Sequence, residues 1–142
     1  MASLFNNFAK GKFADGTIDW DTDDIRLLLV DSTTTVDTEP NVTTISGYAT
    51  LGEISGTGYG RKVLTSKAVN VDTSNNRAEL DADDIVFTGI TAGTTIGFLV
   101  FKFVTNDADN IPIAFSEFSS PFVTNGGDLT IQIDAEGMLQ LT

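Results

Sequence analysis

The side chains best suited to bind a metal ion lie in the segment 15–24, which contains five aspartates. Asp19, Asp21 and Asp23 alternate along the chain, as carboxylates do at the start of a calcium-binding EF-hand loop. Such a loop also requires Gly at its sixth position and Glu at its twelfth, where this sequence has Asp24 and Val30. The pattern is therefore incomplete. The favoured interpretation of these three candidate metal ligands is a solvated loop that precedes a strand.

Acid–base and nucleophilic chemistry have little support in this sequence. The chain contains no His and no Cys, so it lacks an imidazole base, a thiolate nucleophile and any metal site built from those ligands. Neighbouring acids such as Glu79 with Asp81, or Asp83 with Asp84, are of the type that glycosidases use. Those enzymes, however, need two carboxyl groups across a cleft at a defined separation. We therefore expect no enzymatic activity, no catalytic residue and no cofactor.

A glycine-rich segment, Gly56-Thr57-Gly58-Tyr59-Gly60-Arg61-Lys62, has the composition of a phosphate-binding loop. Its spacing fits neither the Walker A motif nor the dinucleotide-binding fingerprint. Alternate glycines are better explained by a tight exposed loop whose backbone adopts left-handed conformations. Arg61 and Lys62 form a basic pair, which makes them candidates for contact with an acidic neighbour.

Charge and length limit the class of partner. The net charge of −12 over 142 residues repels the phosphate backbone, so we expect no nucleic-acid partner. The longest apolar run, which begins at Ile96, is too short to cross a membrane as a helix, and the first seven residues lack the features of a signal peptide. A chain of this length with ten Phe can bury one core. We therefore expect a single domain over residues 1–142 and no membrane association.

The N-terminal segment has the spacing of a short helix. Leu4, Phe5, Phe8 and Ala9 recur at helical intervals, Ser3 is a suitable N-cap, and Gly11 is a suitable end. The spacing predicts one helix over residues 3–10, within an N-terminal helical arm of residues 1–13. This helix either covers one end of its own core or docks on a neighbouring subunit.

Most of the remaining chain alternates between apolar and polar residues, which is typical of strands separated by turns. The segment 25–30 predicts a central strand covered on both faces, and a polar loop follows over residues 31–44. The segment 96–104 predicts the longest strand, and residues 69–80 predict a hairpin. Further strands are expected over 85–88, 111–115, 129–133 and 138–141. About eight strands with regular turns predict an all-β antiparallel sandwich, jelly-roll-like, with one short N-terminal helix.

Several short motifs, in their order along the chain, resemble those of small virion proteins of tailed bacteriophages and prophages. A helix is followed by Ile18-Asp19-Trp20-Asp21-Thr22-Asp23-Asp24-Ile25-Arg26, and then by Ser46-Gly47-Tyr48 and Ser55-Gly56-Thr57-Gly58-Tyr59. Ala82-Asp83-Asp84-Ile85 and Asp134-Ala135-Glu136-Gly137 resemble later landmarks of the same group. The chain departs from that group after Tyr59, where the family often has a glycine-rich insertion before its Lys.

This resemblance implies a structural protein of the phage particle. The expected role is that of a capsid decoration (cement) protein, made in the host cytoplasm, whose partners are the major capsid protein and copies of itself, with a homotrimer favoured. Two alternatives remain open: a tail or fibre component that contacts a host glycan, and a secreted hydrolase or lectin. The interface candidates are apolar residues of the N-terminal segment, two aromatic residues of the motifs and the basic pair: Leu4, Phe5, Phe8, Phe13, Trp20, Tyr59, Arg61 and Lys62.

Overall fold

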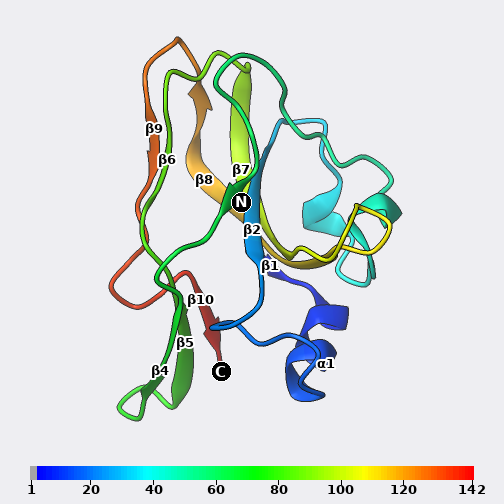
Figure 1. The fold of residues 1–142 in the computed structure, drawn as a ribbon, viewed down its shortest axis with the longest axis vertical. Helices are drawn as coiled ribbons and strands as arrows, with labels where there is room; N and C mark the ends of the chain where they lie inside the picture. Colours follow the sequence, from blue (N-terminus) through cyan, green and yellow to red (C-terminus); the bar gives the residue numbers. More distant parts are fainter. Residues whose placement is uncertain (1–2) are drawn as a thin grey trace.

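The computed structural model describes residues 3–142, which form antiparallel sheets and one short helix. The largest sheet has five strands in the order β1-β8-β7-β2-β3 (Figure 1). Its strands are β1 (Ser3–Phe5), β8 (Ile111–Val123), β7 (Thr94–Lys102), β2 (Ile25–Val30) and β3 (Lys62–Val63). The sheet is open, because β1 and β3 stand at its two edges.

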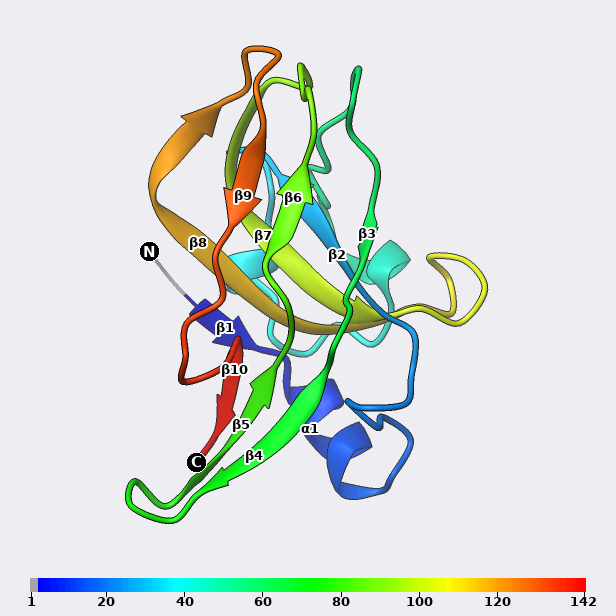
Figure 2. The ribbon, with the colours of Figure 1, turned by 60° about the vertical axis from the view of Figure 1, so that its left-hand side comes forward.

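Two smaller sheets lie over one face of the five-stranded sheet (Figure 2). One has three strands in the order β10-β5-β4, namely β10 (Leu139–Leu141), β5 (Arg77–Asp81) and β4 (Ala68–Asp72). The other pairs β6 (Ile85–Phe87) with β9 (Leu129–Ile131). The chain continues from β5 into β6 and from β9 into β10, so the two small sheets lie end to end.

Strand periodicity divides the apolar residues between two cores. Alternate side chains of a strand point to opposite faces of a sheet, and all six residues of β2 are largely removed from solvent. One core lies between the five-stranded sheet and the small sheets and includes Leu27, Leu29, Phe98, Val100, Leu80, Ile85, Phe87, Leu129 and Ile131. The other lies on the opposite face and includes Leu28, Val30, Leu99, Phe101 and Phe115. The expectation that residues 25–30 form a strand covered on both faces is confirmed.

The expected polar loop after β2 covers the second core. The single-turn 3₁₀ helix η1 (Val36–Thr38) lies within this loop of residues 31–44, and a second one, η2 (Ile45–Gly47), begins immediately after it. Val36 and Ile45 are buried against the face that carries Leu28 and Phe101. These isolated apolar residues in a polar segment hold the loop on the sheet.

The N-terminal segment differs from the expected helix over residues 3–10. Residues Ser3–Phe5 form β1, which pairs with β8 so that Ser3 lies opposite Ser116, and the helix α1 spans Asn7–Ala14. Asn6 is the N-cap, because its side-chain oxygen accepts a hydrogen bond from the backbone N–H of Ala9. Gly11 lies inside the helix instead of ending it. The segment is therefore part of the sheet and the core, and the described part of the predicted arm is not a separate helical unit.

The prediction that residues 96–104 form the longest strand is wrong. The longest strand is β8, with 13 residues against nine in β7. Residues 118–121 of β8 lie opposite the single residue Ile96, because Gly97 pairs with Glu117 and Thr95 with Phe122. This irregularity and Pro121 interrupt the alternation that would have marked a long strand in the sequence. The predicted hairpin of β4 and β5 is confirmed, with Val71 opposite Ala78.

Candidate functional site

The three candidate metal ligands form a tight loop stabilised by its own carboxylates. The backbone N–H of Asp19 donates to a carboxylate oxygen of Asp23 (2.8 Å), and the N–H of Asp21 donates to Asp19 (3.1 Å). Asp23 also forms an ion pair with Lys102 (2.7 Å). Within residues 3–142, no group of three or more acidic side chains is arranged to hold a metal ion. The carboxylates of this loop organise the entry into β2.

The acidic pairs considered for a glycosidase have structural contacts. Glu79 is buried and pairs with Arg77 (2.9 Å). Asp83 accepts hydrogen bonds from the hydroxyls of Thr65 (3.1 Å) and Ser66 (2.6 Å). Asp84 accepts one from the backbone N–H of Ile133 (2.8 Å), which links the segment before β6 to the end of β9. These contacts connect neighbouring segments of the chain.

The glycine-rich loop brings Arg61 into a network of two carboxylates. Its guanidinium donates to both oxygens of Glu53 (2.9 and 2.7 Å) and to both oxygens of Asp107 (2.6 and 2.8 Å). These hydrogen bonds hold the pKa of Asp107 below its usual value. Arg61 therefore neutralises acids of its own chain, which leaves it poorly placed to meet an acidic neighbour.

Tyr59 completes this network and anchors the loop to the core. Its hydroxyl donates to Glu53 (2.7 Å) and accepts from the backbone N–H of Leu29 (3.1 Å), and its ring stacks on Phe87. Burial raises the pKa of the Tyr59 hydroxyl far above its usual value. Gly58 has a φ of +77°, and an added Cβ would lie 2.5 Å from the carbonyl oxygen of Gly89. The loop thus needs glycine for close backbone contact, in agreement with the sequence-based interpretation.

The remaining interface candidates fall into two groups. Trp20 is 2% exposed, and its indole N–H donates to the carbonyl oxygen of Asp81 (2.8 Å), so it is a core residue and cannot be a surface contact in this conformation. The others are half-buried at the molecular surface, where Phe5 and Phe13 pack edge to face and the ammonium of Lys62 lies over the ring of Phe87. These surface members are Leu4, Phe5, Phe8, Phe13 and Lys62.

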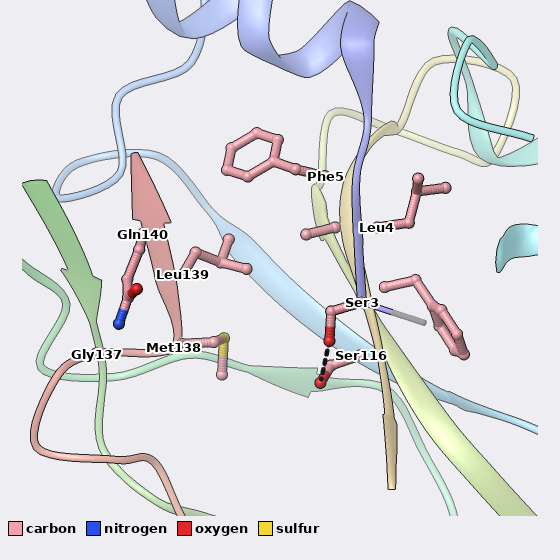
Figure 3. A pocket seen from close by; sticks show the side chains of 10 residues that line it. Ser3, Leu4, Phe5, Ser116, Gly137, Met138, Leu139 and Gln140 are labelled. Atoms are coloured by element: carbon pink, nitrogen blue, oxygen red, sulfur yellow. Dashed lines mark hydrogen bonds between the residues drawn. The ribbon is translucent and has the colours of Figure 1, made fainter. Parts of the chain in front are cut away.

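A groove lies between the outer edges of β1 and β10, and we call it the β1–β10 groove (Figure 3). Its volume is about 270 Å³. Leu139 and Met138 point from the β10 side toward β1, whereas Gln140 points away. On the opposite wall, the hydroxyls of Ser3 and Ser116 lie 3.5 Å apart. The remaining lining residues are Leu4, Phe5, Ala114, Phe115 and Gly137.

Backbone geometry makes this groove possible. Gly137 has a φ of +85°, and an added Cβ would lie 3.0 Å from the carbonyl oxygen of Leu80. Only glycine is comfortable in that conformation and at that distance. The turn at residues 134–137, closed by a hydrogen bond from the N–H of Gly137 to the carbonyl of Asp134 (2.9 Å), therefore delivers Met138 and Leu139 to the groove wall.

A second apolar concavity continues along the same open side of the molecule. It has a volume of about 300 Å³ and lies between β8 and β9, where it is lined by Phe98, Phe118, Phe122, Leu129 and Ile131 among others. In Figure 2, β8 and β9 lie above β1 and β10 on one side of the ribbon. No strand pair joins the five-stranded sheet to the small sheets in the described part of the chain, and both concavities lie along this side.

The β4–β5 hairpin exposes apolar surface at another edge. Val69 is 44% exposed and Val71 is 76% exposed. Residues directly opposite in an antiparallel pair share a face, so these valines lie on the same face as their partners Leu80 and Ala78. That face is buried near Leu80 and becomes exposed toward the hairpin turn.

The surface around these features is acidic because most of the cations are paired internally. Within residues 3–142, five of the eight basic side chains form ion pairs: Lys12, Arg26, Arg61, Arg77 and Lys102. Arg77 alone contacts Asp72, Glu79 and Glu136. No basic residue lines the β1–β10 groove in the described part of the chain. The β1–β10 groove is therefore suited to a partner that binds through complementary shape, apolar contact and backbone hydrogen bonds.

Sequence reasoning identified one wall of the groove through Leu4 and Phe5 and missed the other, formed by Met138 and Leu139. These two were expected only as part of a terminal strand, and no local signal places that strand beside the N-terminus.

Comparison with known proteins gives no match: no family model, no curated protein and no solved structure is significantly similar to the chain. No helix within residues 3–142 is long and apolar enough to cross a membrane.

Proposed function

We propose that this chain is a structural protein of a tailed-bacteriophage particle that decorates the outer surface of the head and stabilises adjacent capsomers. Its partners are the major capsid protein and copies of itself, and it reaches the particle from the host cytoplasm. The ordered motifs from Ile18 to Gly137 support this proposal through their resemblance to phage virion proteins.

The observation that carries the proposal is the partly apolar groove between two strand edges of a highly acidic molecule. A net charge of −12 keeps copies of the chain apart in solution, yet the β1–β10 groove and the exposed valines of β4 offer apolar contact at strand edges. Unpaired strand edges are sites at which another chain can pair. Acidity also suits the outside of a head, away from packaged DNA.

We further infer that the five-stranded sheet and the small sheets act as the two layers of a jelly-roll-like antiparallel β-sandwich. Burial of Leu29 and Val100 from the large sheet with Phe87 and Ile131 from the small ones supports this arrangement. Rigid layers would hold the groove and the β4–β5 hairpin at fixed positions. A decoration protein needs such rigidity to bridge neighbouring subunits through several contacts at once.

The test is to locate the protein in purified particles. Phage particles are induced from a strain that carries the gene, purified on a density gradient and washed at high salt. Mass spectrometry should then find the chain in many copies per particle, and cryo-electron microscopy should place it on the outer head surface. Density at the tail or fibre, or absence of the chain from washed particles, would refute the proposed role.

A further inference from the structure

Asn125 is the only asparagine of the chain that is followed by glycine. Asparagine is a thermolabile residue, and a following glycine has no side chain to hinder attack by its own backbone nitrogen. Asn125 is also exposed in the turn between β8 and β9, where water reaches it. Sequence and exposure together mark this turn as a place where the chain can modify itself.

The reaction is deamidation through a cyclic imide. The backbone nitrogen of Gly126 loses its proton and attacks Cγ of Asn125, so that a new N–Cγ bond forms. The Cγ–Nδ2 bond breaks, and ammonia leaves with that proton. Water then hydrolyses the imide: cleavage at Cγ gives aspartate, and cleavage at the main-chain carbonyl carbon gives isoaspartate. Water is the only co-reactant.

The side chain of Asn125 is already folded along the turn. Its Oδ1 accepts a hydrogen bond from the backbone N–H of Gly127 (3.1 Å), which is the contact of an Asx turn. Gly126 lies between them with a φ of +89°, a conformation that favours glycine. The contact directs the side-chain carbonyl group of Asn125 toward the two glycines that follow.

The attacking nitrogen, in contrast, is restrained. The N–H of Gly126 donates to the carbonyl oxygen of Ile90 (2.9 Å), and the N–H of Ile90 donates to the carbonyl oxygen of Gly127 (3.0 Å). Attack requires the Gly126 nitrogen to lose the proton that it donates to Ile90, so this hydrogen bond opposes the reaction. Deamidation must therefore wait until the contact opens.

The contact belongs to two segments that are linked at several points, residues 89–93 before β7 and residues 124–128 before β9, which we call the paired turns (Figure 2). The hydroxyl of Thr124 donates to the carbonyl oxygen of Gly93 (2.8 Å) and accepts from its N–H (2.8 Å). The carboxylate of Asp128 accepts from the N–H of Gly89 (2.9 Å). These bonds must break together when the turns separate, so opening is rarer than the fraying of a single turn.

We propose that Asn125 is a latent deamidation site, and that opening of the paired turns sets its rate. This inference is independent of the proposed function. Deamidation adds a negative charge near Asp128, and isoaspartate lengthens the backbone of the turn that leads into β9. Since Leu129 and Ile131 of β9 are buried against the large sheet, the paired turns protect the placement of that strand in the core.

The test compares deamidation in the folded and the unfolded protein. Full-length protein is incubated in mildly alkaline buffer with and without urea. Trypsin then releases residues 103–142 as one peptide, because no Lys or Arg follows Lys102, and fragmentation mass spectrometry measures conversion at each asparagine. In urea, Asn125 should react faster than Asn106 and Asn110 of the same peptide. In the folded protein, Asn125 should react at least about tenfold more slowly than in urea.

A substitution in the paired turns provides the matched variants. Thr124→Val keeps the branched shape beside Asn125 and removes the hydroxyl that bonds to Gly93. Its deamidation rate should rise about threefold or more in the folded protein and stay unchanged in urea. Thr130→Val is the control, because Thr130 is exposed on β9 outside the paired turns. Its ratio of the two rates should match that of wild type within about twofold.

Amide hydrogen exchange of the wild type gives a second measure that needs no variant. The N–H of Gly126 should be protected by a factor similar to the ratio of the deamidation rates, because both report the same opening. Equal deamidation rates in folded protein and in urea, or an unprotected Gly126 N–H, would overturn the role of the paired turns. Failure of Asn125 to react ahead of Asn106 and Asn110 in urea would overturn the site itself. Each result holds wherever the protein is found in the particle.

Discussion

At the scale of single residues, Arg61 is the main electrostatic link among the loops at one end of the sheet. It joins Glu53, which follows the covering loop, to Asp107 in the loop between β7 and β8. Each contact is bidentate, and such guanidinium–carboxylate pairs are among the stronger hydrogen bonds in proteins. The arginine side chain is 24% exposed, so solvent screens the network only in part.

This network should make stability depend on acidic pH. The contacts with Arg61 lower the pKa of Asp107 in the folded protein, so its contribution is fully present above the unfolded-state pKa of about 3.9 and is lost as the pH falls through the lower folded-state pKa. Urea unfolding at pH 7 should show Asp107→Asn to be less stable than wild type by about 1 kcal/mol. The difference should shrink as the pH falls below the unfolded-state pKa of about 3.9.

The control for this prediction is Asp21→Asn, which removes one negative charge from an exposed position in another loop. Its free energy of unfolding should stay within about 0.5 kcal/mol of wild type at neutral and at acidic pH. If Asp21→Asn and Asp107→Asn behave alike, net charge and not the Arg61 network would explain the effect.

A second prediction at this scale concerns calcium. The oxygens of Asp19 and Asp23 already accept backbone N–H bonds, and Asp23 is paired with Lys102. Millimolar calcium should therefore raise the melting temperature no more than an equal ionic strength of sodium does, and isothermal titration calorimetry should show no stoichiometric heat. A true site at a hundredfold excess over its Kd would add about 2.7 kcal/mol. Stoichiometric heat that disappears in Asp21→Ala would reverse this expectation.

At the scale of elements, the junction between β1 and α1 depends on Asn6. This buried side chain accepts from the N–H of Ala9 (3.1 Å) and donates to the carbonyl of Val42 (2.9 Å). It thus caps the helix and ties it to the loop over the second core. Because both partners lose a hydrogen bond when the amide is removed, Asn6→Ala should lower the free energy of unfolding by about 1–2 kcal/mol.

Asn7→Ala is the matched control, since Asn7 is exposed and its amide bonds only to the exposed side chains of Asn41 and Lys10. Its cost should be within about 0.5 kcal/mol. Denaturant titrations of both variants check the prediction. Equal destabilisation by the two substitutions would mean that the cap and the link to Val42 are unimportant.

The same junction shows how far local sequence predicts this fold. A nearly continuous apolar run predicted β2, because a strand covered on both faces is apolar throughout. Alternation of apolar and polar residues predicted the β4–β5 hairpin and the shared face of Leu99 and Phe101, because burial of one face imposes a period of two. Residues 3–5 were expected to be helical, because Leu4 and Phe5 fit a helical stripe. Pairing with residues 114–116 of β8 overrides that preference, and a contact across more than 100 residues leaves no local signal.

The candidate site was less predictable than the fold for the same reason. Trp20 and Tyr59 were predicted as interface candidates. Instead, hydrogen bonds to Asp81 and Glu53, respectively, fix the two side chains within the fold. The β1–β10 groove instead combines Ser3 with Met138 and Leu139, which are ordinary residues in two terminal strands. Its character comes from two strand edges that meet only in the folded chain.

At the scale of the whole molecule, apolar strand edges and strong acidity act in opposite directions. The groove and the concavity lined by Phe118 and Phe122 lie on one open side, while the exposed valines lie at the β4 edge. A charge of −12 on each copy resists association at low salt. Contacts between copies should therefore be apolar, and their strength should rise with ionic strength.

We predict that the purified protein forms a symmetric homo-oligomer, with a trimer favoured, through the apolar face of the β4–β5 hairpin. Val71 is 76% exposed beside Val69 on a strand edge without a described partner, which is a typical site of pairing between chains. Val71→Glu adds a charge to that face and should shift the protein to monomer. Sedimentation equilibrium at low and high salt measures this shift, with self-association of the wild type stronger at high salt.

Val123→Glu is the matched control, because Val123 is 65% exposed at the far end of β8. It adds the same charge, so a general effect of net charge would weaken both variants equally. Loss of association in Val71→Glu alone would locate the contact at the hairpin, whereas equal loss in both would assign it to charge. A wild-type protein that stays monomeric at every concentration and salt would contradict the prediction.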